Sequence, residues 1–120
     1  MSNTFPFKTP LDTRAVEGGY ELLAPLKYYS TVLNKTIEVP TGFFTDFASI
    51  PRVARVFITG HGQDRWAAVV HDYLYSVGYD RRTADVIFLE AMEVSGVGFF
   101  KRRLMYRAVR TGGWMFHESN

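Results

Sequence analysis

The N-terminal part of the chain carries the hydrophobic pattern of β-strands. Residues 20–23, 26–33 and 36–39 are rich in Tyr, Val, Ile, Leu and Thr, and turn-forming residues separate these segments. Asn34 tolerates the left-handed backbone conformation that a tight turn needs, and Pro40 ends its strand because it has no N–H to donate. Strand-like segments separated by turn-forming residues predict an antiparallel hairpin or a small meander.

The rest of the chain has helical spacing. Apolar residues recur three and four positions apart over residues 65–75, with Asp64 as the expected N-cap and Gly78 as the residue that closes the helix. A second helix is predicted from residue 81 to about residue 95, with Asp80 as its N-cap.

The third predicted helix, residues 99 to about 111, is basic and should end at Gly112-Gly113. Its narrow apolar stripe is expected to consist of Phe100, Leu104, Met105 and Ala108. Residues 96–120 hold five Lys and Arg residues against one Glu, while the net charge of the whole chain is only +2. The basic segment 101–110 is the one candidate for nucleic-acid binding, and a solvated helix face is the favoured interpretation.

Composition limits the class of protein. The chain has 120 residues, of which 47% are hydrophobic, 16% aromatic and 22% charged, so it can bury a core and is expected to fold as a single domain, 1–120. Zero cysteines exclude disulfides, cysteine metal sites and thiol nucleophiles. No window is apolar enough for a membrane span or a signal peptide, so we expect a protein made in the cytoplasm. The predicted fold is α+β, an N-terminal antiparallel β-hairpin or small sheet packed against a C-terminal three-helix cluster.

Titratable residues lie where the predicted helices should be apolar. His71 and Asp72 are neighbours in the first helix, and Asp85 shares a face of the second helix with Phe88. A carboxylate among such side chains needs a partner, because its desolvation is otherwise costly. His71 and Asp72 are then either a satisfied core histidine and its ion-pair partner, or, with Asp85, a cluster that holds a divalent metal ion or activates water. Asp85 can alternatively be a first-turn carboxylate that complements the helix N-terminus.

Residues 45–52 are a third candidate segment. Asp46 lies among phenylalanines, Ser49 supplies a hydroxyl, and Arg52 supplies a fork-shaped donor suited to a carboxylate or phosphate. A structural ion pair of Arg52 with Asp46 or Asp72 is the alternative. Ser49 is a weaker candidate nucleophile, because no Gly-x-Ser-x-Gly elbow surrounds it.

We expect the loop 46–52 to lie against the helix that carries His71. The polar groups would then converge on one concave site. The candidate catalytic residues are Asp46, Ser49, Arg52, His71 and Asp72, and the candidate ligands of a divalent metal ion are His71, Asp72 and Asp85.

Three stretches and a set of spaced residues stand out together: 39–43, 45–52 (TDFASIPR), 68–75 (ending HDYLY), and Ala84-Asp85 with Phe88 and Ala91-Met92. In these positions the sequence resembles a family of small uncharacterised proteins, a domain of unknown function, that occurs in tailed bacteriophages and prophage regions. The resemblance runs over most of the chain. It implies a phage-derived origin and a place among virion, assembly or lysis functions, with no activity attached.

Two functions are therefore predicted side by side. The first is a hydrolase-like enzyme, with His71 as metal ligand or general base and Arg52 orienting an anionic group. The second is a non-enzymatic virion or tail component, made in the host cytoplasm, whose polar cluster is structural and whose aromatic surface binds virion or tail proteins. A solvent-reachable cluster with a pocket favours the enzyme, and a sealed, fully paired cluster favours the structural component.

Overall fold

The computed structural model describes residues 6–58 and 63–118, without the side chains of residues 53, 63 and 113–118. Its N-terminal part forms two antiparallel sheets, one of three strands in the order β1-β2-β5 and one in which β3 pairs with β4. The strands are β1 (Thr13–Val16), β2 (Gly19–Leu22), β3 (Leu26–Ser30), β4 (Lys35–Val39) and β5 (Phe44–Thr45). As predicted, Asn34 takes a left-handed conformation, with φ of 58°, in the turn before β4.

The C-terminal part is helical. The helices are α1 (Arg52–Arg55), α2 (Gln63–Ser76), α3 (Arg81–Val94) and α4 (Phe99–Glu118). Asp80 caps α3 as predicted, because its side chain accepts hydrogen bonds from the backbone N–H groups of Arg82 and Thr83. The N-cap role predicted for Asp64 is wrong, because α2 already begins at Gln63. The buried Asp64 carboxylate instead accepts a hydrogen bond from Lys101 Nζ at 2.6 Å.

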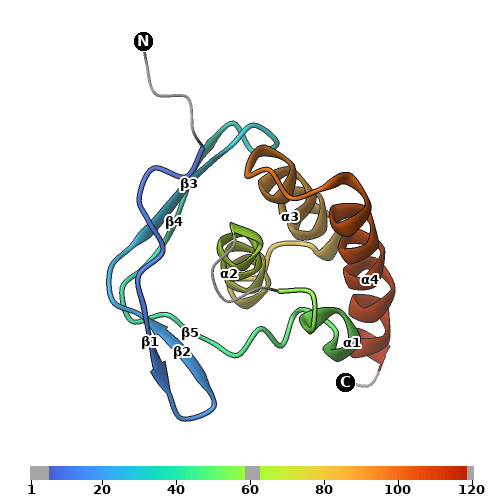
Figure 1. The fold of residues 1–120 in the computed structure, drawn as a ribbon, viewed down its shortest axis with the longest axis horizontal. Helices are drawn as coiled ribbons and strands as arrows, with labels where there is room; N and C mark the ends of the chain where they lie inside the picture. The colour runs from blue at the N-terminus through green and yellow to red at the C-terminus, as the bar shows by residue number, and fades with distance from the viewer. Residues whose placement is uncertain (1–5, 59–62, 119–120) are drawn as a thin grey trace.

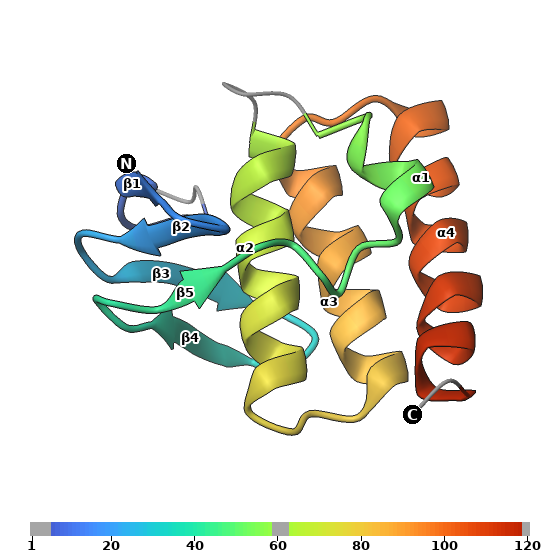
Figure 2. The ribbon, with the colours of Figure 1, turned by 90° about the horizontal axis from the view of Figure 1, so that it is seen from below.

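The elements form successive layers. Figure 1 shows α2 standing between the strands and the pair α3 and α4. Turned by 90°, the sheets, α2, α3 and α4 follow one another across the molecule (Figure 2). In agreement with this view, α2 packs on α3, α3 packs on α4, and strands β4 and β5 both contact α2. The predicted α+β fold, an antiparallel β part packed against three long helices, is confirmed.

The central position of α2 follows from its sequence. Four consecutive residues, 67–70, are fully buried, together with Leu74. A helix that is apolar around its circumference has to be covered on opposite sides, and here the strands cover one side and α3 the other. His71 continues this buried run, so its imidazole lies in the core and not in a groove.

Glu90 of α3 ties the β3-β4 sheet to the helices. Its Oε1 accepts hydrogen bonds from the hydroxyls of Tyr28 (2.7 Å) and Ser30 (2.9 Å). Its Oε2 accepts from the backbone N–H groups of Thr31 (2.9 Å) and Val32 (3.1 Å), and from the Thr31 hydroxyl. This carboxylate and its donors, called the Glu90 clamp below, fix the end of β3 and the start of its turn against α3.

The final helix differs from its prediction at its C-terminus. α4 continues through Gly112 to Glu118, although two adjacent glycines usually end a helix. Gly112 is required there by packing, because a Cβ on it would lie 2.1 Å from Pro51 Cγ. The helix thus passes close to the start of α1.

The apolar stripe predicted for α4 is wrong in part. Met105 and Val109 are buried, but Phe100 and Leu104 are 86% and 50% exposed. Periodicity alone could not tell which side of this mixed apolar and basic helix would face α3.

Two strands and one short helix were not predicted. Strand β1 has two polar residues followed by two apolar ones and so does not alternate, while β5 has two residues and α1 has four. None of them shows a periodic pattern of useful length. None of the helices in residues 6–58 and 63–118 has the length and apolar character of a membrane span.

Candidate functional site

A serine, a histidine and an aspartate from three segments form a hydrogen-bonded chain. Ser49 Oγ lies 2.9 Å from His71 Nδ1, and His71 Nε2 lies 2.6 Å from Asp85 Oδ1. Ser49 belongs to the loop after β5, His71 to α2 and Asp85 to α3. The side chains of His71 and Asp85 are fully buried, whereas Ser49 retains 9% exposure. The chain therefore runs from a nearly covered hydroxyl into the core.

The hydrogen-bonding partners assign the proton positions along this chain. A carboxylate only accepts hydrogen bonds, so His71 Nε2 carries the proton that it donates to Asp85. In the neutral ring Nδ1 is then an acceptor, and the Ser49 hydroxyl donates to it. This is the proton arrangement of a serine next to a general base whose ring a carboxylate orients.

Asp85 is held by two further donors. Arg110 Nη1 of α4 donates to Oδ2 at 2.9 Å, and the Tyr75 hydroxyl donates to Oδ1 at 3.2 Å. Burial, followed by the charge and hydrogen bond of Asp85, raises the pKa of Tyr75, and nearby Arg81 opposes this rise. Tyr75 thus stays a neutral donor, while Arg110 supplies the positive charge that a buried carboxylate requires.

The ring of His71 is also fixed by aromatic neighbours. Its centroid lies 4.6 Å from that of Tyr75 and 4.8 Å from that of Phe88, with both ring pairs tilted. Such contacts stabilise tilted ring pairs. The two ring contacts and the two hydrogen bonds together fix the imidazole in one orientation.

Asp72 positions the serine loop. Its Oδ1 accepts a hydrogen bond from the backbone N–H of Ser49 at 3.1 Å, and its Oδ2 accepts from the Thr45 hydroxyl at 2.6 Å. Because His71 and Asp72 are adjacent on α2, one helix turn holds both the side chain and the backbone of Ser49. Figure 2 shows the segment after β5 crossing α2 and α3 on its way to α1.

The backbone of this loop is strained two residues before Ser49. Phe47 has φ of 60°, in the left-handed region that bulky residues rarely occupy. The Thr45 hydroxyl accepts a hydrogen bond from the Phe47 N–H, and the Phe47 ring lies 5.9 Å from that of Tyr20. Strain of this kind costs about 1–3 kcal/mol and is concentrated at functional sites.

Not every predicted site residue joins this cluster. Asp46 is exposed, and its carboxylate accepts a hydrogen bond from the N–H of Ala48 in its own loop. Arg52 is exposed on α1, and the ion pairs found in the described part of the chain include neither Arg52 with Asp46 nor Arg52 with Asp72. Asp72 lies one hydrogen bond away, through the Ser49 backbone.

The metal prediction meets a geometric obstacle. Both ring nitrogens of His71 are engaged, one by Ser49 and one by Asp85, and the Asp72 carboxylate points to Thr45 and Ser49. No group of three His, Cys, Asp or Glu side chains suited to a metal ion occurs within residues 6–58 and 63–118. A metal on His71 would have to displace one of its partners.

Sequence reasoning missed Thr45, Tyr75 and Arg110 as parts of the site. Tyr75 follows His71 at i+4, on the same helix face, which was a usable signal. Arg110 follows directly after the buried Val109 and so lies at the edge of the basic stripe. Its partner, in another helix, could not be found from spacing alone.

Comparison with known proteins gives a family and no activity. Residues 20–109 match the family described as "Protein of unknown function (DUF1353)". This span contains Ser49, His71 and Asp85 and ends one residue before Arg110. No curated protein and no solved structure matches the chain. Since the match covers most of the sequence, the chain belongs to the DUF1353 family of proteins of unknown function.

Proposed function

We propose that this protein is a small hydrolase in which Ser49 is the nucleophile, His71 the general base and Asp85 the group that orients and stabilises His71. The observation that carries the proposal is the unbroken hydrogen-bonded chain from Ser49 Oγ through His71 to Asp85, with its least buried end at the hydroxyl. The strained backbone of Phe47 in the same loop supports it.

The proposed reaction is acyl transfer on an ester or amide carbonyl. Ser49 Oγ attacks the carbonyl carbon as its proton moves to His71 Nδ1, and the resulting imidazolium is paired with Asp85. His71 then protonates the leaving group, which leaves an acyl-serine. Water attacks this ester as His71 Nδ1 accepts one of its protons. When the bond between the acyl carbon and Ser49 Oγ breaks, His71 returns that proton to Oγ, which releases the acid and restores the free Ser49 hydroxyl.

Arg110 has a defined part in this mechanism. By pairing with Asp85 Oδ2, it keeps the carboxylate acceptor-only while His71 gains and loses a proton. It is a positioning residue, since it acts through Asp85. The resemblance to tailed-phage and prophage proteins supports a place in the phage cycle, with bonds of the host cell wall or of peptides as the first substrates to screen.

A second function, a non-enzymatic virion or tail component, is favoured by a different observation. The backbone N–H groups of Ala48, Ser49 and Ile50 donate to Asp46, Asp72 and Phe47, so none of the three can stabilise an oxyanion in this conformation. His71 and Asp85 are also sealed from solvent and paired, which is the outcome expected from the sequence for the structural component. In this alternative the cluster only fastens the loop to the helices.

Covalent labelling separates the two functions. The native protein is incubated with a fluorophosphonate, which forms a stable bond to base-activated serines, and the modified residue is mapped by mass spectrometry. The hydrolase predicts labelling at Ser49 that is lost in Ser49→Ala and in His71→Gln. Ser76→Ala is the matched control, because the Ser76 hydroxyl is exposed and donates only to the Tyr73 carbonyl.

The outcome against the hydrolase is equally definite. A folded protein, verified by circular dichroism, that reacts at no serine, or reacts at Ser49 and Ser76 alike, supports the structural role. The proposed divalent metal is tested in the same preparation by metal analysis and by thermal shift with Mg²⁺, Mn²⁺ and Zn²⁺. Metal that binds the native chain and is lost in both His71→Gln and Asp72→Asn would support a metal-assisted form of the reaction.

A further inference from the structure

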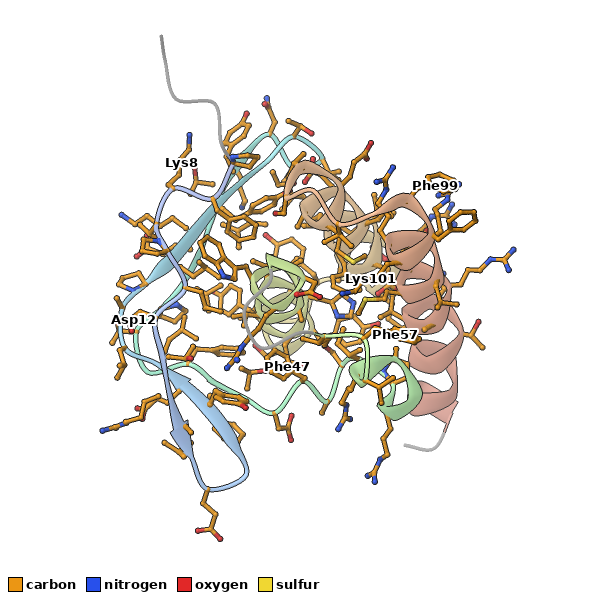
Figure 3. All side chains as sticks on the ribbon, viewed as in Figure 1. Lys8, Asp12, Phe47, Phe57, Phe99 and Lys101 are labelled. Atoms are coloured by element: carbon orange, nitrogen blue, oxygen red, sulfur yellow. The ribbon has the colours of Figure 1, made fainter. Side chains whose placement is uncertain are left out.

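The N-terminal half of α4 exposes aromatic and aliphatic side chains that are not part of the Ser49 site. Phe99, Phe100 and Leu104 are 56%, 86% and 50% exposed. Figure 3 shows Phe99 on the outer side of α4, away from α2 and the sheets. A hollow of about 480 Å³ lies among these side chains, and its lining, called the α4 surface below, consists of Phe99, Phe100, Arg103, Leu104, Tyr106 and Arg107. Apolar residues grouped in this way mark interaction sites more often than single exposed ones do.

The charge of the α4 surface has one sign. Residues 96–112 contain five Lys and Arg residues and no Asp or Glu. Lys101 pairs with Asp64 and Arg110 with Asp85, so these two cations are neutralised inside the molecule. The ion pairs of the described residues leave Arg103 and Arg107 without a carboxylate, and both are exposed.

The arginines and the apolar residues alternate along one side of the helix. Phe99, Arg103 and Arg107 follow at i, i+4 and i+8, beside Phe100 and Leu104 at i and i+4. Arg103 lies 5.8 Å from the centre of the Phe99 ring, so the positive charge borders the hollow directly. A ligand for this surface needs an apolar side chain for the hollow and carboxylates beside it.

We propose that the α4 surface binds an acidic amphipathic segment of a partner protein, which inserts apolar side chains into the hollow and pairs its carboxylates with Arg103 and Arg107. The hollow favours a protein segment over a lipid surface, because a bilayer meets a broad apolar face and not a recess bordered by arginines. It is favoured over nucleic acid because few cations near the hollow lack a carboxylate in the ion pairs of the described residues, and because the whole chain carries a net charge of only +2. These cations are Arg103 and Arg107 in the lining and Arg102, 5.3 Å from the centre of the Phe99 ring.

The test uses two synthetic helical peptides of about 15 residues, a length that spans this helix face. Both carry Leu and Phe at i, i+4 and i+7, flanked in one peptide by Glu and in the other by Lys. Binding to the native protein is followed by fluorescence anisotropy. We expect the Glu peptide to bind about tenfold or more tightly than the Lys peptide, and more weakly as salt is added.

Variants locate the binding and keep the test interpretable. Phe100→Ala with Leu104→Ala should weaken binding of the Glu peptide about tenfold, and Arg103→Glu should reverse the preference between the peptides. Phe57→Ala and Lys35→Glu are the matched controls. Phe57 is exposed in the turn after α1 and Lys35 at the start of β4, so both variants should leave binding unchanged. All of these side chains are exposed, so circular dichroism should show native folding in every variant.

Three results would overturn the proposal. The first is equal binding, or no binding, of the two peptides. The second is an oligothymidine that binds the native protein more tightly than the Glu peptide and loses affinity in Arg103→Glu. The third is the same behaviour with phosphatidylserine-containing vesicles. None of these results depends on Ser49, so the test of the α4 surface and the test of the hydrolase are independent of each other.

Discussion

Two carboxylates of α3, the fully buried Asp85 and the half-buried Glu90, each connect a segment of the N-terminal part to the helices, and they do so in different ways. Glu90 accepts hydrogen bonds only from one short segment, the end of β3 and the turn after it. Asp85 accepts from His71, Tyr75 and Arg110, which come from two other helices. Beyond His71 the contacts continue to a serine hydroxyl.

The two clusters therefore differ in what they can do. The Glu90 clamp can only hold segments together, whereas the hydrogen-bonded chain of Ser49, His71 and Asp85, called the Ser49 relay below, can pass a proton. Every donor to Glu90 is a hydroxyl or a backbone N–H, none of which gains or loses a proton easily near neutral pH, so this cluster can only hold. The Asp85 cluster contains an imidazole, which can take up a proton within the physiological range. A cluster that only holds two segments together does not need an imidazole, and the Glu90 clamp in the same fold has none. The proposed activity rests on that contrast.

Removing Asp85 should produce the largest loss of stability. Asp85→Ala leaves the fully buried His71 and the half-buried Arg110 without their carboxylate, and we expect the free energy of unfolding to fall by roughly 3–5 kcal/mol. Urea denaturation measures this change. Asp85→Asn, which keeps the shape and one acceptor, should lose less stability but should still abolish labelling of Ser49. Full labelling in Asp85→Asn would show that the carboxylate has no part in activating the serine.

Removing Glu90 should produce the second largest loss of stability. Glu90→Ala deprives the buried hydroxyls of Tyr28 and Ser30 of their acceptor, and we expect a loss of about 2–3 kcal/mol. Because the Glu90 clamp is separate from the Ser49 relay, the fluorophosphonate should still label Ser49 at the native rate under conditions where the variant is folded. A parallel loss of labelling would mean that both clusters only maintain the fold.

Two serine variants compare the clusters directly. Ser49→Ala and Ser30→Ala each remove one hydroxyl that donates to an acceptor of its cluster, and each should lower stability by about 1 kcal/mol or more. Ser30→Ala should lose at least as much as Ser49→Ala, because the Ser30 hydroxyl also accepts a hydrogen bond from the Leu33 N–H. Only Ser49→Ala should eliminate labelling and hydrolysis of ester substrates. Activity that survives in Ser49→Ala at its native level would remove Ser49 from the mechanism.

The smallest effect is expected at alkaline pH. Burial and the adjacent Glu90 raise the pKa of Tyr28 above its ordinary value of 10.0, and burial and Asp85 do the same for Tyr75. A pKa that is raised in the folded state gives stability that is complete below the unfolded pKa and is lost as pH rises. The urea concentration at the midpoint of denaturation should therefore stay constant up to about pH 10 and decrease above it.

Single variants assign this alkaline loss to the two clusters. Tyr28→Phe and Tyr75→Phe should each make the decline above pH 10 shallower, because phenylalanine has no proton to lose. The absorbance of phenolate follows the ionisation directly. If all seven tyrosines ionise together near their ordinary pKa while the protein stays folded, the two clusters do not protect their tyrosines as described.

The sequence predicted the parts of this fold that have a regular pattern. The hairpin around Asn34, the two helices that carry His71 and Asp85, and the cap at Asp80 all follow from local periodicity and turn chemistry. The same signals singled out Ser49, His71 and Asp85 as residues out of place in their surroundings, since polar groups among apolar neighbours require partners.

What could not be predicted depends on contacts between distant segments. In the sequence, Gly112 predicts the end of a helix. Its close contact with Pro51, which a Cβ would prevent, explains why a glycine lies inside α4 instead. Asp46 and Arg52 look equivalent to Ser49 in the sequence, yet the left-handed turn at Phe47 directs Ser49 inward and leaves both charged side chains in solvent. The pairing of Arg110 with Asp85 depends on the rotation of α4, which its mixed pattern does not specify.

The tautomer of His71 is the most direct test of the relay. Nitrogen NMR of protein labelled at its three histidines, with His71→Gln to assign the resonances, reports which ring nitrogen of His71 carries the proton. We expect a proton on Nε2, toward Asp85, and an unprotonated Nδ1 that accepts the hydrogen bond from Ser49. A neutral ring with its proton on Nδ1 would contradict this expectation, because a ring that donates to Ser49 cannot take the proton of that hydroxyl.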